Sequence, residues 1–233
     1  MEINSDFETF LLISSKKLTI YVNSKIDKKI YEKELTYNLK KNDLIIDKLD
    51  FFLNEKIFKI EKKLKNFIKK IYIILDSENF FPIEISLKKN DYENFYNSKS
   101  LNYLLNEAKD SCKKTIDDRN LIHMIITNYR IDEKSYSSLP TNIEGNTSSI
   151  DVKFICISNN FIKSLIKVLK KYQISLGQVV SAKYVSEFPS QDKNNIFIKT
   201  KKIMNGLNPN EVLIVDKSIK NSGFFEKFFN FFS

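Results

Sequence analysis

The sequence predicts a mixed fold of helices and strands, α/β or α+β, and three observations predict it. Short apolar runs typical of strands alternate along the chain with longer segments whose apolar residues recur at helical spacing. A hydrophobic fraction of 42% over 233 residues suffices for the packed core of one or two domains. With only two cysteines, neither a disulfide framework nor a zinc-binding set is expected to hold the fold.

The first third of the chain contains a strand hairpin and a long amphipathic helix. Residues 14–17, Ser-Ser-Lys-Lys, form the predicted turn between the first two strands. Over residues 43–68, side chains such as Leu49 and Phe52 fall near one helical face, and most lysines lie away from it. The run 71–75 is continuously apolar and predicts a central strand. The strands predicted in this part are 10–13, 18–22, 30–37 and 71–75.

The middle of the chain continues this mixture of elements. Pro82 has no backbone donor, so its strand is predicted to lie at a sheet edge or to start there. Residues 132–149 are polar and predict a loop, and residues 186–195 predict a linker. The predicted helices are 91–114 and 160–172. The predicted strands are 80–85, 121–131, 149–157, one that starts near 179–182, and two short ones at 196–198 and 212–215.

The net charge of +9, from 38 basic and 29 acidic residues, is spread along the whole chain. Lysines are interleaved with acids, as in residues 61–65, Glu-Lys-Lys-Leu-Lys, which is typical of a solvated surface rather than a nucleic-acid groove. The chain has no tryptophan and no cluster of basic and aromatic residues with RNA-module spacing. Nucleic-acid binding is therefore kept only as an alternative function.

No catalytic, cofactor-binding or metal-binding constellation is predicted. His123, the only histidine, lies in an apolar strand and is expected to be a structural residue with its hydrogen bonds satisfied. Cys112 and Cys156 lie in no recognisable nucleophile setting. A metal site would need further histidines, cysteines or clustered acids. The four glycines argue against an activity that needs several glycine-rich phosphate turns.

The C-terminal segment is the most informative local feature, because six of its last ten residues are phenylalanine. On a helix these rings occupy an arc of about 160°, with Glu226, Lys227 and Asn230 on the opposite arc. Such a helix is typical of an in-plane membrane anchor, and lysines add attraction to anionic lipid. The alternative is a terminal helix docked on the protein's own core or on a partner chain. The predicted membrane-binding residues are Phe224, Phe225, Phe228, Phe229, Phe231, Phe232, Lys220 and Lys227.

Residues 107–188 resemble FtsA, the actin-related family of bacterial cell division proteins. Residues 119–132 are similar to a strand of that family in which an arginine, a histidine and a Tyr-x-Ile/Val-Asp ending recur. The proline and glycine of 139–145, the strand 151–155 and the segment 174–180 follow in the order of that family's SHS2 subdomain, called 1C. An aromatic, amphipathic C-terminal helix that attaches the protein to the membrane is also a feature of the family.

The resemblance implies a partial actin-like first subdomain with an inserted SHS2-like domain and a C-terminal amphipathic helix. It implies that residues 1–76 and 178–215 form the actin-like remnant, 77–177 the SHS2-like domain, and 216–233 the linker and anchor. The expected function is that of a non-enzymatic cell division adaptor, peripheral on the inner face of the cytoplasmic membrane. Its expected partners are division proteins and further copies of itself, bound through the SHS2-like domain.

Two departures from the family bear on the nucleotide. Actin-like ATPases carry Asp-x-Gly turns around the phosphates, and this chain contains no Asp-x-Gly, so no ATP cofactor is expected. The 45 residues after residue 188 are too few for the second actin-like half, which also holds the family's FtsZ-binding surface, so direct FtsZ binding is in doubt. A divergent actin-like ATPase adaptor of the pilus-assembly type is the alternative.

Overall fold

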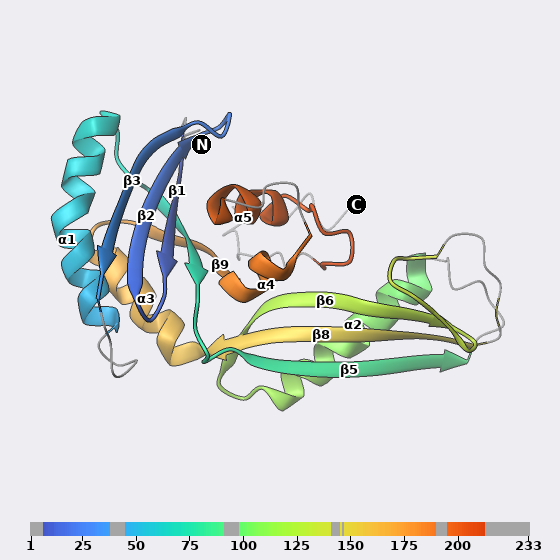
Figure 1. The fold of residues 1–233 in the computed structure, drawn as a ribbon. Helices are drawn as coiled ribbons and strands as arrows, with labels where there is room; N and C mark the ends of the chain where they lie inside the picture. Colours follow the sequence, from blue (N-terminus) through green and yellow to red (C-terminus); the bar gives the residue numbers. More distant parts are fainter. Residues whose placement is uncertain are drawn as a thin grey trace, which may run out of the picture.

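The computed structural model describes residues 7–37, 45–90, 98–140, 145, 147–189 and 195–212. It has two β-sheets that lie side by side, each with its own helices (Figure 1). The strands are β1 Phe7–Ile13, β2 Lys17–Ser24, β3 Lys29–Thr36, β4 Lys70–Leu75, β5 Phe81–Asn90, β6 Arg119–Ile131, β7 Lys134–Tyr136, β8 Thr147–Ser158 and β9 Ser175–Ser181. The helices are α1 Ile45–Leu64, α2 Ser98–Thr115, α3 Asn159–Lys171, α4 Ala182–Glu187 and α5 Ile196–Met204.

The first sheet has the strand order β3-β2-β1-β4-β9. Strands β1 to β3 form an antiparallel meander, whereas β4 and β9 join it in parallel through helical crossovers. Helices α1 and α3 cover one face (Figure 1), and the apolar stripe of α1, with Leu49, Phe52 and Leu53, is fully buried there. The mixed fold class of helices and strands is therefore confirmed.

Helix α5 lies on the opposite face of the first sheet (Figure 1), where the Phe197 ring stacks on Tyr21 with centroids 4.4 Å apart. Lys201 of this helix pairs with Glu8 and Asp27 at 2.9 and 2.7 Å. The prediction of a short strand at 196–198 is wrong. Asn195 caps a helix there, because its Oδ1 accepts the backbone N–H groups of Phe197 and Ile198.

The second sheet is antiparallel throughout, in the order β5-β8-β6-β7. Helix α2 covers one face with Leu104, Ala108 and Cys112, all buried. Part of the other face is polar, where the Asp151 carboxylate accepts from Ser86 at 2.6 Å and pairs with Arg130 at 2.8 Å. Elsewhere on this face, Ile155 is buried against residues of β9 and α4. Strand β5, which contains Pro82, lies at the edge as predicted, and the predicted loop 132–149 contains the three-residue strand β7.

Helix α3 links the two sheets. It follows directly from β8 of the second sheet, and its residues Leu165, Val168 and Leu169 pack with α1 in the core of the first sheet. The resemblance placed this helix in the inserted domain, whereas its apolar face contributes to the first core. Within the described residues, no helix is long and apolar enough to cross a membrane.

Candidate functional site

A hollow of about 970 Å³ lies at the carboxyl ends of β1 and β4. In open sheets with parallel strands, ligands bind in the crevice at this edge, so it is the place to test for a nucleotide. The β1–β2 turn, the start of α1, residues 75–79 after β4 and the start of α3 line the hollow. The resemblance given above implies that an actin-like first subdomain would offer these elements to a phosphate chain.

The β1–β2 turn is closed by a serine hydroxyl. Ser14 Oγ accepts the backbone N–H groups of Lys16 and Lys17 at 3.3 and 3.1 Å, and it donates to the Lys17 carbonyl at 3.1 Å. Tyr37 fixes the turn from outside, because its hydroxyl donates to the Ser14 carbonyl at 2.6 Å. Burial raises the pKa of Tyr37 to about 12, which keeps this donor protonated. Two N–H groups of the turn are thus directed at Ser14 itself rather than at a ligand.

The start of α3 is also occupied by the chain's own groups. The Asn159 N–H donates to the Asp118 carbonyl at 3.1 Å, and the Asn160 N–H donates to Ser158 Oγ at 3.2 Å. The free N–H groups of a helix N-terminus are what attract anions. Capping by Ser158 therefore removes part of that attraction from the hollow.

The charges around the hollow oppose a polyphosphate. Among its lining residues, Lys16 is the one basic side chain, and Asp47, Asp76 and Glu78 are acidic. Within the described residues, no group of three histidines, cysteines, aspartates or glutamates is placed to hold a metal ion that would offset these acids. The residues at this edge of the sheet do not fit ATP, because the Ser14 hydroxyl occupies the turn and three acidic side chains line the hollow.

His123 is a buried structural residue, as the sequence predicts. Its Nε2 accepts the Ser181 N–H at 3.0 Å, so Nδ1 carries the proton and donates to Glu211 Oε1 at 2.7 Å. The Tyr184 hydroxyl donates to Glu211 Oε2 at 2.7 Å and accepts from Asn208 Nδ2 at 2.7 Å. Burial raises the pKa of Tyr184 and so favours its protonated, donating form. This network ties β6 of the second sheet to β9, α4 and residues 205–212.

The two cysteines are buried and do not meet His123. Cys112 of α2 and Cys156 of β8 belong to the core of the second sheet, and both are free thiols. Burial raises the pKa of Cys156 to about 12, which disfavours the reactive thiolate. That neither cysteine acts as a nucleophile stays a prediction, and the burial of both thiols favours it.

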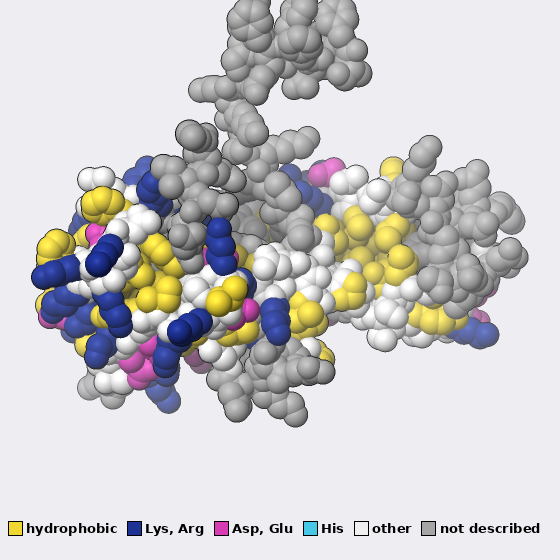
Figure 2. Space-filling view, turned by 90° about the horizontal axis from the view of Figure 1, so that it is seen from above, with side chains coloured by type: hydrophobic (Ala, Val, Ile, Leu, Met, Phe, Trp, Pro, Cys, Tyr) yellow, Lys and Arg dark blue, Asp and Glu magenta, His cyan; other side chains and the backbone are white. Residues whose placement is uncertain are grey.

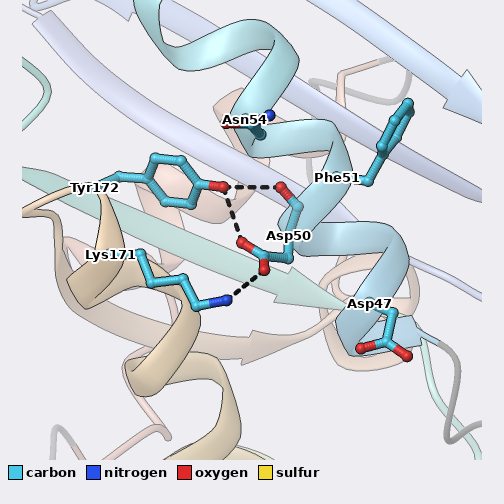
Figure 3. A pocket seen from close by; sticks show the side chains of 6 residues that line it. All are labelled: Asp47, Asp50, Phe51, Asn54, Lys171 and Tyr172. Atoms are coloured by element: carbon cyan, nitrogen blue, oxygen red, sulfur yellow. Dashed lines mark hydrogen bonds and ion pairs between the residues drawn. The ribbon is translucent and has the colours of Figure 1, made fainter.

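A second hollow, of about 580 Å³, lies between α1 and the end of α3 (Figure 3). Lys171 and Tyr172 both point at Asp50 there. The Tyr172 hydroxyl is 2.8 Å from Asp50 Oδ1 and 2.9 Å from the Asp50 carbonyl oxygen, and Lys171 forms an ion pair with the carboxylate. These contacts hold α1 against α3, and the carboxylate that a ligand would meet is already paired.

Asp50 gives the protein a testable pH dependence. The hydrogen bond from Lys171 holds the pKa of Asp50 below its ordinary value of 3.8, despite partial desolvation. A lowered folded-state pKa means that the pair stabilises the fold above about pH 4 and that this contribution is lost as the pH falls through the folded pKa. Because the pair is partly exposed, its contribution is below about 1 kcal/mol. The difference in unfolding free energy between the wild type and Asp50→Asn should shrink between pH 6 and pH 2 in urea titrations.

The predicted membrane-binding residues Phe224, Phe225, Phe228, Phe229, Phe231, Phe232, Lys220 and Lys227 lie outside the described residues, as do positions 213–215 of the predicted last strand. Their assignment therefore stays a prediction. Glu211 is the residue that sequence reasoning missed, because it lies 88 positions from its partner His123 and no local pattern marks it.

No family model and no curated protein matches the chain. Among solved structures, it is similar to the cytoplasmic domain of EpsL, an inner-membrane component of the type II secretion system of Vibrio cholerae, at 12% identity, over 79% of this chain and 59% of that one, with a TM-score of 0.39. It is similar to the PilM–PilN type IV pilus biogenesis complex at 9% identity, over 77% and 48%, with a TM-score of 0.42.

A Bacteroides thetaiotaomicron protein with an actin-like ATPase fold and unknown function is similar at 14% identity, over 77% and 53%, with a TM-score of 0.34. The chain thus spans about half of the length of each of these three solved structures. Each similarity is one of overall fold at low identity.

Proposed function

We propose that the chain is a non-enzymatic, FtsA-like adaptor of cell division that attaches to the inner face of the cytoplasmic membrane. The observation that carries the non-enzymatic part is the closed β1–β2 turn, in which the Ser14 hydroxyl accepts two backbone N–H groups. An actin-like ATPase directs such groups at phosphate. The acidic side chains around the same hollow also oppose nucleotide binding, because they repel a phosphate chain.

The second sheet is the proposed site for protein partners. Within the described residues, strand β5 pairs with β8 alone, so one long side of it is an edge on which a partner strand can form backbone hydrogen bonds. The polar face beside it, with Asp151, Arg130 and Lys153, supplies charged groups for specificity. The division assignment itself rests on the resemblance of residues 107–188 to FtsA.

Membrane attachment is assigned to the phenylalanine-rich segment 224–232. Its rings fall on one helical arc, and lysines at 220 and 227 add attraction to anionic headgroups. Attachment through this segment places the two sheets at the bilayer surface, where an adaptor meets other membrane-bound proteins.

Crosslinking in cells, followed by capture of the chain from the membrane fraction, tests the adaptor role. We expect division proteins to be recovered, in the same yield with and without ATP depletion, since the adaptor needs no nucleotide. Recovery of pilus or secretion proteins instead would assign the chain to that class of assembly. Recovery of ribosomes or nucleic acid alone, or a yield that depends on ATP, would contradict the proposal.

A further inference from the structure

The second half of α1 and the turn that follows it carry exposed aromatic rings among lysines. Phe58 is 73% exposed and Phe67 is 72% exposed, although phenylalanine side chains are usually buried in a folded domain. Residues 56–70 contain seven lysines and one acid, Glu61. Figure 2 shows basic side chains gathered at the end of the molecule that carries α1, with hydrophobic side chains between them. We call Phe58, Phe67, Lys59, Lys62, Lys65 and Lys69 the aromatic–basic surface.

This surface is built on a fixed support. The Glu61 carboxylate accepts the Ile68 N–H at 2.9 Å, which folds the turn back onto the last turn of α1. The Phe67 N–H donates to Asn66 Oδ1 at 2.9 Å, and Ile68 is buried beneath the turn. Glu61 is therefore engaged with the backbone, and the one acid of the stretch is not directed at the lysines. Within the described part of the chain, Lys59, Lys62 and Lys65 form no ion pair.

We infer that the aromatic–basic surface is a second membrane contact, made by the folded part of the chain with an anionic lipid bilayer. Aromatic rings enter the headgroup layer of a bilayer while neighbouring lysines stay at the level of the phosphates. Positive charge on the protein meets negative charge on the lipid, which is the complementarity that this contact needs. The inference deepens the membrane role proposed above and does not depend on the position of the C-terminal segment.

Two observations favour a bilayer over other occupants. A second copy of this chain would bring a like-charged surface against it, because the net charge is +9 and the surface itself is basic. A peptide would need a groove, and neither of the two hollows described above is lined by Phe58 or Phe67. A surface with two exposed rings among lysines suits a planar, deformable partner.

The test measures binding of the full chain to vesicles of phosphatidylglycerol and phosphatidylcholine by cosedimentation. We expect Phe58→Ser with Phe67→Ser, and separately Lys59→Glu with Lys62→Glu, to lower the partition coefficient by about tenfold or more. Leu139→Ser and Lys183→Glu, both exposed positions outside this surface, are the matched controls and should leave it unchanged. Circular dichroism and thermal unfolding check that each variant is folded.

The same variants in a chain that also carries Phe228→Glu and Phe229→Glu separate this inference from the C-terminal anchor. If the chain with the altered tail still binds vesicles, and the variants of the aromatic–basic surface then abolish that binding, the inference is supported. The inference would be overturned if the Phe228→Glu, Phe229→Glu change lowers vesicle binding and the variants of the aromatic–basic surface have no effect in either background. The C-terminal anchor would then remain supported. The inference would also be overturned if the variants of the aromatic–basic surface lose binding to a 30-nucleotide RNA but keep full vesicle binding. That result would favour a nucleic-acid surface.

Discussion

Replacing Glu211 with alanine is expected to lower the free energy of unfolding by about 3 kcal/mol, because two buried donors lose their acceptor at about 1–3 kcal/mol each. The carboxylate is 4% exposed and receives His123 Nδ1–H on one oxygen and the Tyr184 hydroxyl on the other. His123 is 1% exposed and Tyr184 is 9% exposed, so solvent has little access to either donor. Urea unfolding followed by circular dichroism measures the change.

Glu187→Ala is the matched control for this prediction, since Glu187 lies on the same helix as Tyr184 and its ion pair with Lys183 is long, 4.0 Å, and exposed. It should change stability by less than about 0.5 kcal/mol. A Glu211→Ala variant as stable as this control would mean that the network does not hold the second sheet in place.

Introducing glutamate at Phe228 and Phe229 is expected to lower partition into anionic vesicles by at least about 100-fold. On the proposed anchor, two rings that would insert into lipid are lost at about 1.5–3 kcal/mol each, and two charges replace them. Asn230→Glu adds one charge on the opposite arc and is the matched control, with a much smaller expected loss. Vesicle cosedimentation at low and moderate salt measures both. Equal binding by the intact and the glutamate-bearing chain would contradict the assignment of the tail as an anchor.

Local pattern predicted most of the secondary structure. Leu49, Phe52 and Leu53 are one helical stripe in the sequence and one buried stripe in α1, because amphipathic periodicity is a direct consequence of burying one face. The run 196–198 misled because three apolar residues do not distinguish a strand from a short helix. The Asn195 cap in front of it is the local signal that favours a helix.

The long-range contacts could not be predicted in the same way. The absence of Asp-x-Gly suggested that the first turn does not bind phosphate, but the use of the Ser14 hydroxyl to occupy the turn is visible only in three dimensions. His123 was expected to have its hydrogen bonds satisfied, yet its partners Ser181 and Glu211 lie 58 and 88 positions away. The exposure of Phe58 depends on which face of α1 meets the sheet, and this contact is not a local property of the sequence. From the sequence alone, the lysines around Phe58 indicate only a solvated surface.

The proposal that the first sheet and its helices work without nucleotide is tested most directly by isothermal titration calorimetry of the full chain with magnesium-ATP. Because Ser14 occupies the turn and Asp47, Asp76 and Glu78 surround the hollow, the account predicts no binding heat up to millimolar nucleotide. A saturable isotherm with micromolar affinity would contradict it.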